Sequence, residues 1–253
     1  NQVHSSQPGT FNISAAMLHI IAMTFMLMDH LWATLLPAQD WLTCVGRLAF
    51  PIFAFMAVEG YFYTHSFKKY ILRLLLFAVL SEIPFDLMYG GTWFYPFHQN
   101  VIWTLLIGLS GIHLMEKVRK KRKQWIFLPT AVLVVLVGSA LGTIGMADYY
   151  GAGVLTLFIF YFFRGRKWWC ISGQLLALYW VNVELLGGLM YPIRFWGMDF
   201  ELCQQELALL SLLPIWLYRG RQGCHTKIFQ YSCYAFYPVH MLLLALVLNY
   251  VNR

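Results

Sequence analysis

One stretch near the start of the sequence, from Ile13 to Leu36, is apolar over a length that can cross a lipid bilayer, because about 20 apolar residues span its hydrocarbon core. This stretch nevertheless contains His19, Asp29 and His30. An ionisable side chain at the centre of a membrane helix costs at least about 2.5 kcal/mol, so each of the three needs a partner or a function. His19 and His30 are eleven residues apart and lie on one face of a helix with about 3.6 residues per turn, whereas the adjacent Asp29 points about 100° away from His30. We therefore expect their partners on other helices or on a substrate.

The composition indicates that most of the chain behaves like this first stretch. Of its 253 residues, 60% are hydrophobic and only 11% are charged, with a mean hydropathy of +0.60, whereas average soluble domains are about 25% charged. We therefore predict an all-α, polytopic transmembrane helix bundle, formed by a single domain over residues 13–253 and preceded by a flexible segment over residues 1–12. The five cysteines show no zinc-binding spacing, and we expect no metal.

Apolar runs separated by short polar or basic links predict about nine spans. Prolines, which break helices, fall inside several of these runs, among them Pro51, Pro84, Pro214 and Pro238. The longest predicted link covers residues 191–204. The predicted spans are residues 13–36, 41–63, 70–89, 98–117, 125–141, 148–163, 168–190, 205–218 and 228–251.

The basic residues are concentrated in alternate links. Fifteen of the 18 Lys and Arg residues fall there or within about a helical turn, and the densest cluster is Lys117–Lys123. This is the positive-inside pattern of membrane proteins, so we expect no nucleic-acid partner despite the isoelectric point near 9.2. It predicts a cytoplasmic N-terminus. The first apolar run is long and has no basic residue before it, so we expect no cleavable signal peptide.

With this orientation, the polar residues inside the spans form two layers. The layer near the inner face contains His19, Glu59, Arg73 and His113. Because His19 and His30 share a helix face, the two layers suggest a polar path through the bundle. The layer near the outer face is the larger, and its members are Asp29, His30, Arg47, Glu82, Asp86, Asn100, Asp148 and His240.

Several of these residues also have a structural interpretation. Glu82 and Asp86 are four residues apart on one helix face, and two such carboxylates need a counter-charge, for which Arg47 is the natural candidate. Asn100 and Asp148 stand at predicted helix starts, where N-capping is the simpler role.

Two further pairings are alternatives to a function. His240 follows Pro238 and could hydrogen-bond a backbone carbonyl that this proline leaves free. His19 and Glu59 could satisfy one another. For His30 we favour a function, because an unpaired histidine inside a membrane helix is a poor structural choice.

Taken together, several stretches of the sequence resemble the TraX-like membrane proteins, which include conjugative pilin N-acetylases and are related to a large superfamily of membrane acyltransferases. The resemblance extends from residue 13 to residue 245. The stretches that carry it are MLHIIAMTFMLMDHLW, GRLAFPIFAFMAVEGYFYT, SEIPFDLM, QNVIWTLLIGL, ADYYGAGVLTL and YAFYPVHMLLL.

The resemblance implies a membrane-embedded acyltransferase. His30 stands where these enzymes place their catalytic histidine, with Asp29 beside it. His19 replaces the Lys or Arg usual in relatives, and Tyr218-Arg219-Gly220 replaces a Tyr-Asn-Gly. The shared polar positions, which we expect to bind the acceptor substrate, are Arg47, Glu82, Asp86, Asn100, Asp148 and His240.

We therefore expect transfer of an acyl group, most simply acetyl, from cytosolic acyl-CoA to an amine or hydroxyl acceptor near the outer half of the membrane. His30 would act as general base, or alternatively carry the acyl group covalently. His19, Arg73 and Glu59 would bind the CoA donor at the inner face. A protein N-terminus, an amino sugar, a lipid headgroup or a small amine would all fit as acceptor.

Two other classes of function stay open at the level of sequence. A proton-coupled transporter or permease would use the same buried His, Asp and Glu side chains, although the chain has no internal repeat. A scaffold for assembly would need no chemistry.

Overall fold

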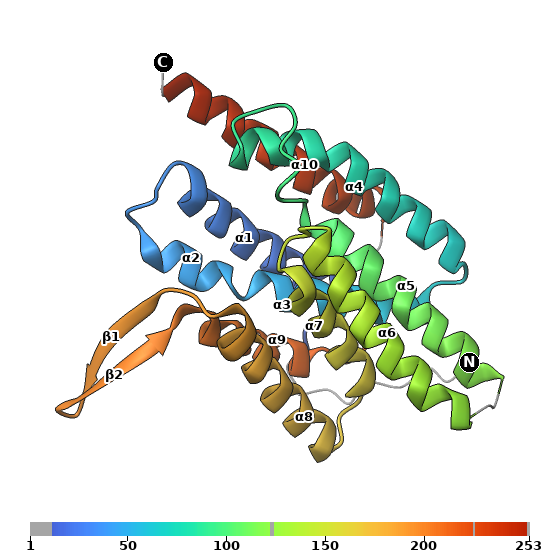
Figure 1. Cartoon of the computed structure of the whole chain (residues 1–253). Coiled ribbons are helices and arrows are strands. Elements are labelled where there is room, and N and C mark those ends of the chain that lie inside the picture. The colour runs from blue at the N-terminus through green and yellow to red at the C-terminus, as the bar shows by residue number, and fades with distance from the viewer. Residues whose placement is uncertain (1–11, 122–123, 225, 252–253) are drawn as a thin grey trace.

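A computed structural model describes residues 12–121, 124–224 and 226–251, so the predicted flexible segment over residues 1–12 lies almost entirely outside the described residues. The fold is nearly all α-helical, as predicted (Figure 1). The elements, in chain order, are α1 (Ala15–Thr34), α2 (Asp40–Gly46), α3 (Ala49–Tyr63), α4 (Phe67–Tyr89), α5 (Val101–Lys120), α6 (Gln124–Ile144), α7 (Tyr150–Phe162), α8 (Trp168–Tyr179), the π-helix η1 (Trp180–Leu186), β1 (Met190–Phe195), β2 (Met198–Cys203), the 3-10 helix η2 (Gln204–Ser211), α9 (Leu212–Leu217) and α10 (Lys227–Val251).

Five helical segments of the described residues are long and apolar enough to cross a membrane: residues 15–34, 40–63, 101–120, 125–144 and 227–251. They mark the chain as a membrane protein. Helix α4 is also long, but it carries Lys68, Lys69, Arg73, Glu82 and Asp86. The full set of nine spans and the cytoplasmic N-terminus stay predictions.

The second predicted span, residues 41–63, is broken into α2 and α3 at Arg47 and Leu48. Pro51 explains the break: it has no N–H for the carbonyl of Arg47, four residues earlier, and its ring clashes with that carbonyl. Pro51 itself fits in the first turn of α3, where an N–H would have no helical partner. Arg47 therefore lies at the C-terminal cap of α2, and its backbone stays in the right-handed helical region.

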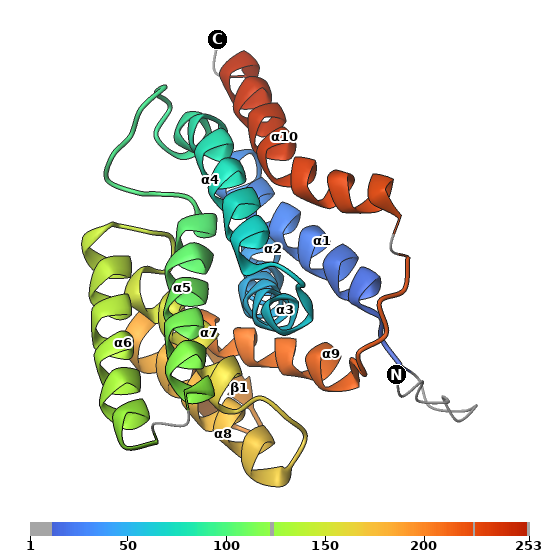
Figure 2. The same ribbon diagram turned by 90° about the vertical axis from the view of Figure 1, so that its right-hand side faces the viewer.

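Helix α3 lies at the centre of the bundle, in contact with α1, α5, α7, α9 and η2 (Figure 2). Its buried side chains include Phe50, Ile52, Ala54 and Val58. Helix α7 is buried over Gly151–Tyr161 although it has only 13 residues. Helix α10 packs against α4 and α1 and bends along its length (Figure 2), as expected for a helix that contains Pro238.

The prediction that residues 191–204 form a loop was wrong. Strands β1 and β2 form an antiparallel hairpin, with Tyr191 opposite Leu202 and Phe195 opposite Met198. Trp196 and Gly197 both have positive φ (51° and 79°), which suits a two-residue turn matched to the twist of the strands. The hairpin projects away from the helices (Figure 1), so the all-α class needs this one correction.

Candidate active site

His30 and His240 meet in the interior, although 210 positions separate them in the sequence. Helix α1 supplies His30 and α10 supplies His240; both side chains are buried, and Nδ1 of His30 lies 2.7 Å from Nε2 of His240. The two rings are nearly parallel, with an angle of 12° and centroids 4.9 Å apart. Tyr89 and Tyr237 pack beside His30, with ring centroids 6.0 and 6.4 Å away.

The hydrogen bonds of His240 determine where the protons of this pair lie. Nδ1 of His240 is 2.6 Å from the carbonyl oxygen of Phe236, which can only accept, so Nδ1 carries the hydrogen. In a neutral ring Nε2 is then an acceptor, and it takes the hydrogen that Nδ1 of His30 donates. Nε2 of His30 is consequently left with a free lone pair.

The prediction that His240 bonds a carbonyl freed by a proline needs correction. Pro238 leaves the carbonyl of Tyr234 without a helical partner, since that residue lies four positions earlier. His240 instead bonds the carbonyl of Phe236 and, with its other nitrogen, His30. The second bond joins α10 to α1.

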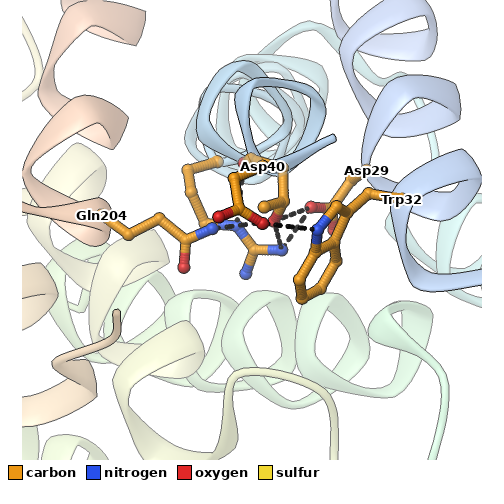
Figure 3. Close-up of polar contacts among 6 residues, drawn as sticks. Asp29, Trp32, Asp40 and Gln204 are labelled. Carbon is orange, nitrogen blue, oxygen red and sulfur yellow. Dashed lines mark hydrogen bonds and ion pairs between the residues drawn. The ribbon is translucent and has the colours of Figure 1, made fainter. Parts of the chain in front are cut away.

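Asp29, the residue before His30 on α1, is held by a separate network (Figure 3). Its Oδ1 accepts hydrogen bonds from the guanidinium group of Arg47 and from Oγ1 of Thr43, the latter at 2.7 Å. Oγ1 of Thr43 in turn accepts from Nε2 of Gln204 at 2.9 Å. Nearby, Nε1 of Trp32 donates to Asp40 at 3.2 Å. Thr43 and Arg47 are four residues apart and therefore lie on one face of the α2 segment, which faces α1.

A cavity of about 240 Å³ joins His30 to this network. Its polar lining comes from Asp29, His30, Arg47, His98 and Asp148, and its remaining lining includes the aromatic residues Trp32, Phe50, Phe53, Tyr89, Tyr149 and Tyr237. Such a mixture of an apolar wall with a few converging polar groups is typical of small-molecule sites.

His98 and Asp148 form an ion pair within this lining, with Nε2 of His98 3.3 Å from Oδ1 of Asp148.

The prediction that Asp148 caps the N-terminus of α7 was wrong. The capping position is Tyr149, and its backbone is left-handed, with φ of 62°. Oδ1 of Asp148 accepts from the N–H of Tyr149 at 3.1 Å. Met146 and Tyr150 also have positive φ, and each such conformation costs of order 1–3 kcal/mol. Strained backbone of this kind is often found at functional sites.

Glu82, Asp86 and Asn100 lie outside the cavity lining, and Arg47 does not pair with the two carboxylates as predicted. Asn100 donates to Glu82 and to the carbonyl of Ala78, and Nε1 of Trp103 donates to Glu82 at 2.9 Å. The N–H of Tyr95 donates to Asp86 at 2.9 Å. The predicted N-cap role of Asn100 is confirmed, since its side chain accepts from the N–H of Ile102.

The predicted inner layer is not brought together. Glu59 pairs with Arg164 at 2.6 Å rather than with His19. Arg73 lies over the ring of Tyr234, 5.6 Å from its centroid, and His113 bonds the hydroxyl of Tyr61. His19 is half-buried and hydrogen-bonds no other described residue. The donor-binding role of His19, Arg73 and Glu59 stays a prediction.

Sequence reasoning missed several residues of the site. His98 was assigned to a helix start and given no role, and its partner Asp148 lies 50 positions away. Thr43 and Gln204 are 161 positions apart. The aromatic residues that line the cavity carry no signal that separates them from the many others in a chain with 15 Tyr and 20 Phe.

The comparison with protein families agrees with the resemblance seen in the sequence. The family model described as "TraX protein" matches residues 14–248. The chain belongs to the TraX protein family. It is also 27% identical over 253 residues, covering 92% of this chain and 95% of the relative, to a protein described as "Probable fimbrial assembly protein FimC, serogroup H1" from Dichelobacter nodosus. No solved structure matches the chain.

For this TraX protein, the family match includes every residue that lines the cavity. Among the described residues, no cluster of three or more His, Cys, Asp or Glu side chains is arranged to hold a metal ion. The side chains of the cavity that can take part in chemistry include His30, His98 and the charged groups around them.

Proposed function

We propose that this TraX protein is a multi-pass enzyme of the bacterial cytoplasmic membrane that transfers an acyl group, most simply acetyl, from cytosolic acyl-CoA to an amine or hydroxyl acceptor near the outer half of the membrane. The observation that carries the proposal is the free lone pair on Nε2 of His30, in a side chain that lines a cavity of about 240 Å³. A neutral imidazole nitrogen of this kind is suited to accept a proton or to attack a carbonyl carbon.

In the proposed reaction, Nε2 of His30 removes a proton from the acceptor as the acceptor attacks the thioester carbon. A bond forms between the acceptor and the acyl carbon, the bond from that carbon to sulfur breaks, and the proton passes from His30 to the departing thiolate. His240 keeps Nδ1 of His30 in the donor form, which leaves Nε2 available throughout. Transfer through a covalent acyl-histidine would use the same nitrogen.

The other charged residues take roles that follow from their positions. Asp29 and Arg47 line the cavity as a fixed ion pair, and with Asp148 we assign them to acceptor binding. Donor binding is assigned to the basic inner face, where Arg73 would contact the CoA phosphates. Three residues outside the cavity, Glu82, Asp86 and Asn100, hold α4 and the link before α5 that shape its wall.

The acceptor is proposed to be a subunit of a surface fibre. The relative from Dichelobacter nodosus is described as a probable fimbrial assembly protein, and the family resemblance points to pilin acetylation. An amino group of such a subunit would be the nucleophile.

The experiment is an acyl-transfer assay on purified protein in detergent or nanodiscs, with labelled acetyl-CoA and an added amine, following both the acylated product and free CoA. We expect turnover by the wild type and a fall in kcat of about 10²–10⁴-fold for His30→Ala, since general acid–base catalysis contributes that much. His113→Ala is the matched control, because His113 bonds Tyr61 outside the cavity.

Two results would contradict the proposal. Wild-type turnover by His30→Ala would remove the catalytic role, and equal damage from His113→Ala would mean that the assay reports the fold. If the wild type neither transfers nor hydrolyses acetyl-CoA, the buried ionisable groups are better explained by proton-coupled transport.

A further inference from the structure

The cavity contains a second histidine, His98, whose surroundings differ from those of His30. His98 lies in the link before α5, and its side chain is 29% exposed, whereas His30 is buried. Its partner is the carboxylate of Asp148, which is 30% exposed and lines the same cavity. The site therefore holds one histidine paired with another histidine and one paired with a carboxylate.

The backbone around this second pair is tied together. The N–H of Gln99 bonds the carbonyl of Met146, and the N–H of Asp148 bonds the carbonyl of Gln99, both at 2.9 Å. Oγ1 of Thr104 donates to the carbonyl of Asp148 at 2.6 Å. These bonds keep the two side chains in register although their segments lie at the starts of different helices.

The pairing also determines which nitrogen of His98 is available. Nε2 faces Oδ1 of Asp148 and therefore carries a hydrogen. In the neutral ring, Nδ1 then has a free lone pair, and no described residue donates a hydrogen bond to it. This is the arrangement by which a carboxylate orients a histidine base in other enzymes.

The charges around His98 are mostly negative. The hydrogen bond to Asp148 raises the pKa of His98 above its ordinary value of 6.5, against the opposing effect of partial burial, and the charges of Asp148, Glu82 and Asp86 act in the same direction as the bond. Tyr89 and Phe85, from α4, are the aromatic neighbours of its ring. An acidic surrounding of this kind favours a cationic ligand, such as an ammonium group.

We propose that His98, oriented by Asp148, is the base that deprotonates the acceptor's ammonium group before the amine attacks the acyl thioester. This inference rests on the proposed transfer to an amine. The ammonium group gives one proton to Nδ1 of His98, and His98 releases it to water through its exposed side. The neutral amine then forms the carbon–nitrogen bond, its second proton goes to His30, and His30 passes it to the departing thiolate.

A division of labour between the two histidines follows from their burial. An amine at neutral pH is mostly protonated and has no lone pair for attack, so one proton must leave before the reaction. His30 is enclosed and bonded to His240, so a proton it accepts has no short route to water. His98 is partly exposed and can exchange its proton.

The test compares two nucleophiles with the full-length protein and acetyl-CoA: a primary aliphatic amine, which is protonated at neutral pH, and hydroxylamine, which is not. For His98→Gln at pH 7 we expect a loss of about 10²-fold with the aliphatic amine and a much smaller loss with hydroxylamine. Raising the pH should restore the rate with the aliphatic amine. His30→Ala, the control, should lose both reactions.

Asp148→Asn provides a second test if His98→Gln does not fold. Removing the carboxylate lowers the pKa of His98, so the rising limb of the pH–rate profile should move to lower pH. The inference is overturned if His98→Gln loses the same fraction of its rate with both nucleophiles. It is also overturned if the rising limb of the pH–rate profile stays at the same pH in Asp148→Asn. Either result would show that the pair is merely structural. The inference is likewise overturned if the wild type transfers the acetyl group to hydroxylamine but not to the aliphatic amine. If the wild type transfers it to neither nucleophile, the proposed function itself is overturned.

Discussion

At the scale of single residues, the site depends on polar groups, buried or partly buried, that satisfy one another in pairs. His30 bonds His240, Asp29 bonds Arg47, and Asp148 bonds His98. The two pairings that involve histidines each leave a defined group for chemistry: Nε2 of His30 and Nδ1 of His98 both retain a lone pair. This pairing explains how several ionisable side chains persist in an apolar bundle.

The Asp29–Arg47 pair provides the first prediction at this scale. Its side chains are only 13% and 17% exposed, so Arg47→Leu leaves a buried carboxylate without a counter-charge. We expect the free energy of unfolding to fall by about 3–5 kcal/mol, and the double variant with Asp29→Asn to recover part of this loss. Thermal unfolding in one detergent measures both.

The hairpin pair Arg194–Asp199 is the matched control, because its side chains are 76% and 81% exposed. Arg194→Ala should cost at most about 1 kcal/mol. Simple addition of the losses from Arg47→Leu and Asp29→Asn would show that the two buried side chains do not stabilise one another.

At the scale of elements, the site depends on how closely α1 approaches α2. Gly46, the last residue of α2, makes this approach possible, because a Cβ atom there would lie 2.4 Å from Cβ and 2.7 Å from Oδ1 of Asp29. Thr43 and Arg47, one turn apart on the same face, then both reach Oδ1 of Asp29.

Gly46→Ala should therefore destabilise the protein and lower its activity together. Overpacking of this kind costs about 1–3 kcal/mol, and the added methyl group would displace the carboxylate that Arg47 and Thr43 hold. Gly60→Ala, in α3, is the control, because the nearest atom to its added methyl would be the hydroxyl of Tyr70 at 3.2 Å. The melting temperature and the rate of acyl transfer of both variants test this prediction. Equal effects of Gly46→Ala and Gly60→Ala would contradict the packing argument.

At the scale of the whole molecule, the two ends of the bundle differ in charge. The C-terminal end of α5, whose last turn carries Lys117, Arg119 and Lys120, lies at the opposite end of the bundle from the loop after α4 and the end of α10 (Figures 1 and 2). Positive charge near one end of a membrane bundle marks the cytoplasmic side. The cavity lies toward the other end, since the link before α5 and the start of α7 help to line it.

A reporter that works only outside the cytoplasm should therefore be active when fused after Arg253. A reporter that works only in the cytoplasm should be active when inserted between α5 and α6. Alkaline phosphatase and green fluorescent protein at the two positions measure this. A C-terminal reporter that works only in the cytoplasm would reverse the orientation and place the cavity on the side of the donor.

The sequence by itself determined the class of the protein and most of its candidate residues. Long apolar runs with few charges indicate membrane helices whatever the tertiary arrangement, because burial in lipid depends on composition alone. His30, Asp29, Arg47, Asp148 and His240 were all recognisable as ionisable groups within or beside such runs. Asn100 was also predictable as an N-cap, because capping is a local interaction.

Only the tertiary structure decided which of these residues meet. Arg47 pairs with Asp29 rather than with the carboxylates of α4. Glu59 pairs with Arg164 rather than with His19. His98 belongs to the site because it pairs with Asp148, 50 positions away in the sequence. A pairing between helices depends on the rotation and height of both helices and on breaks such as the one at Pro51. These are set by packing over the whole bundle, so no local pattern of residues contains them.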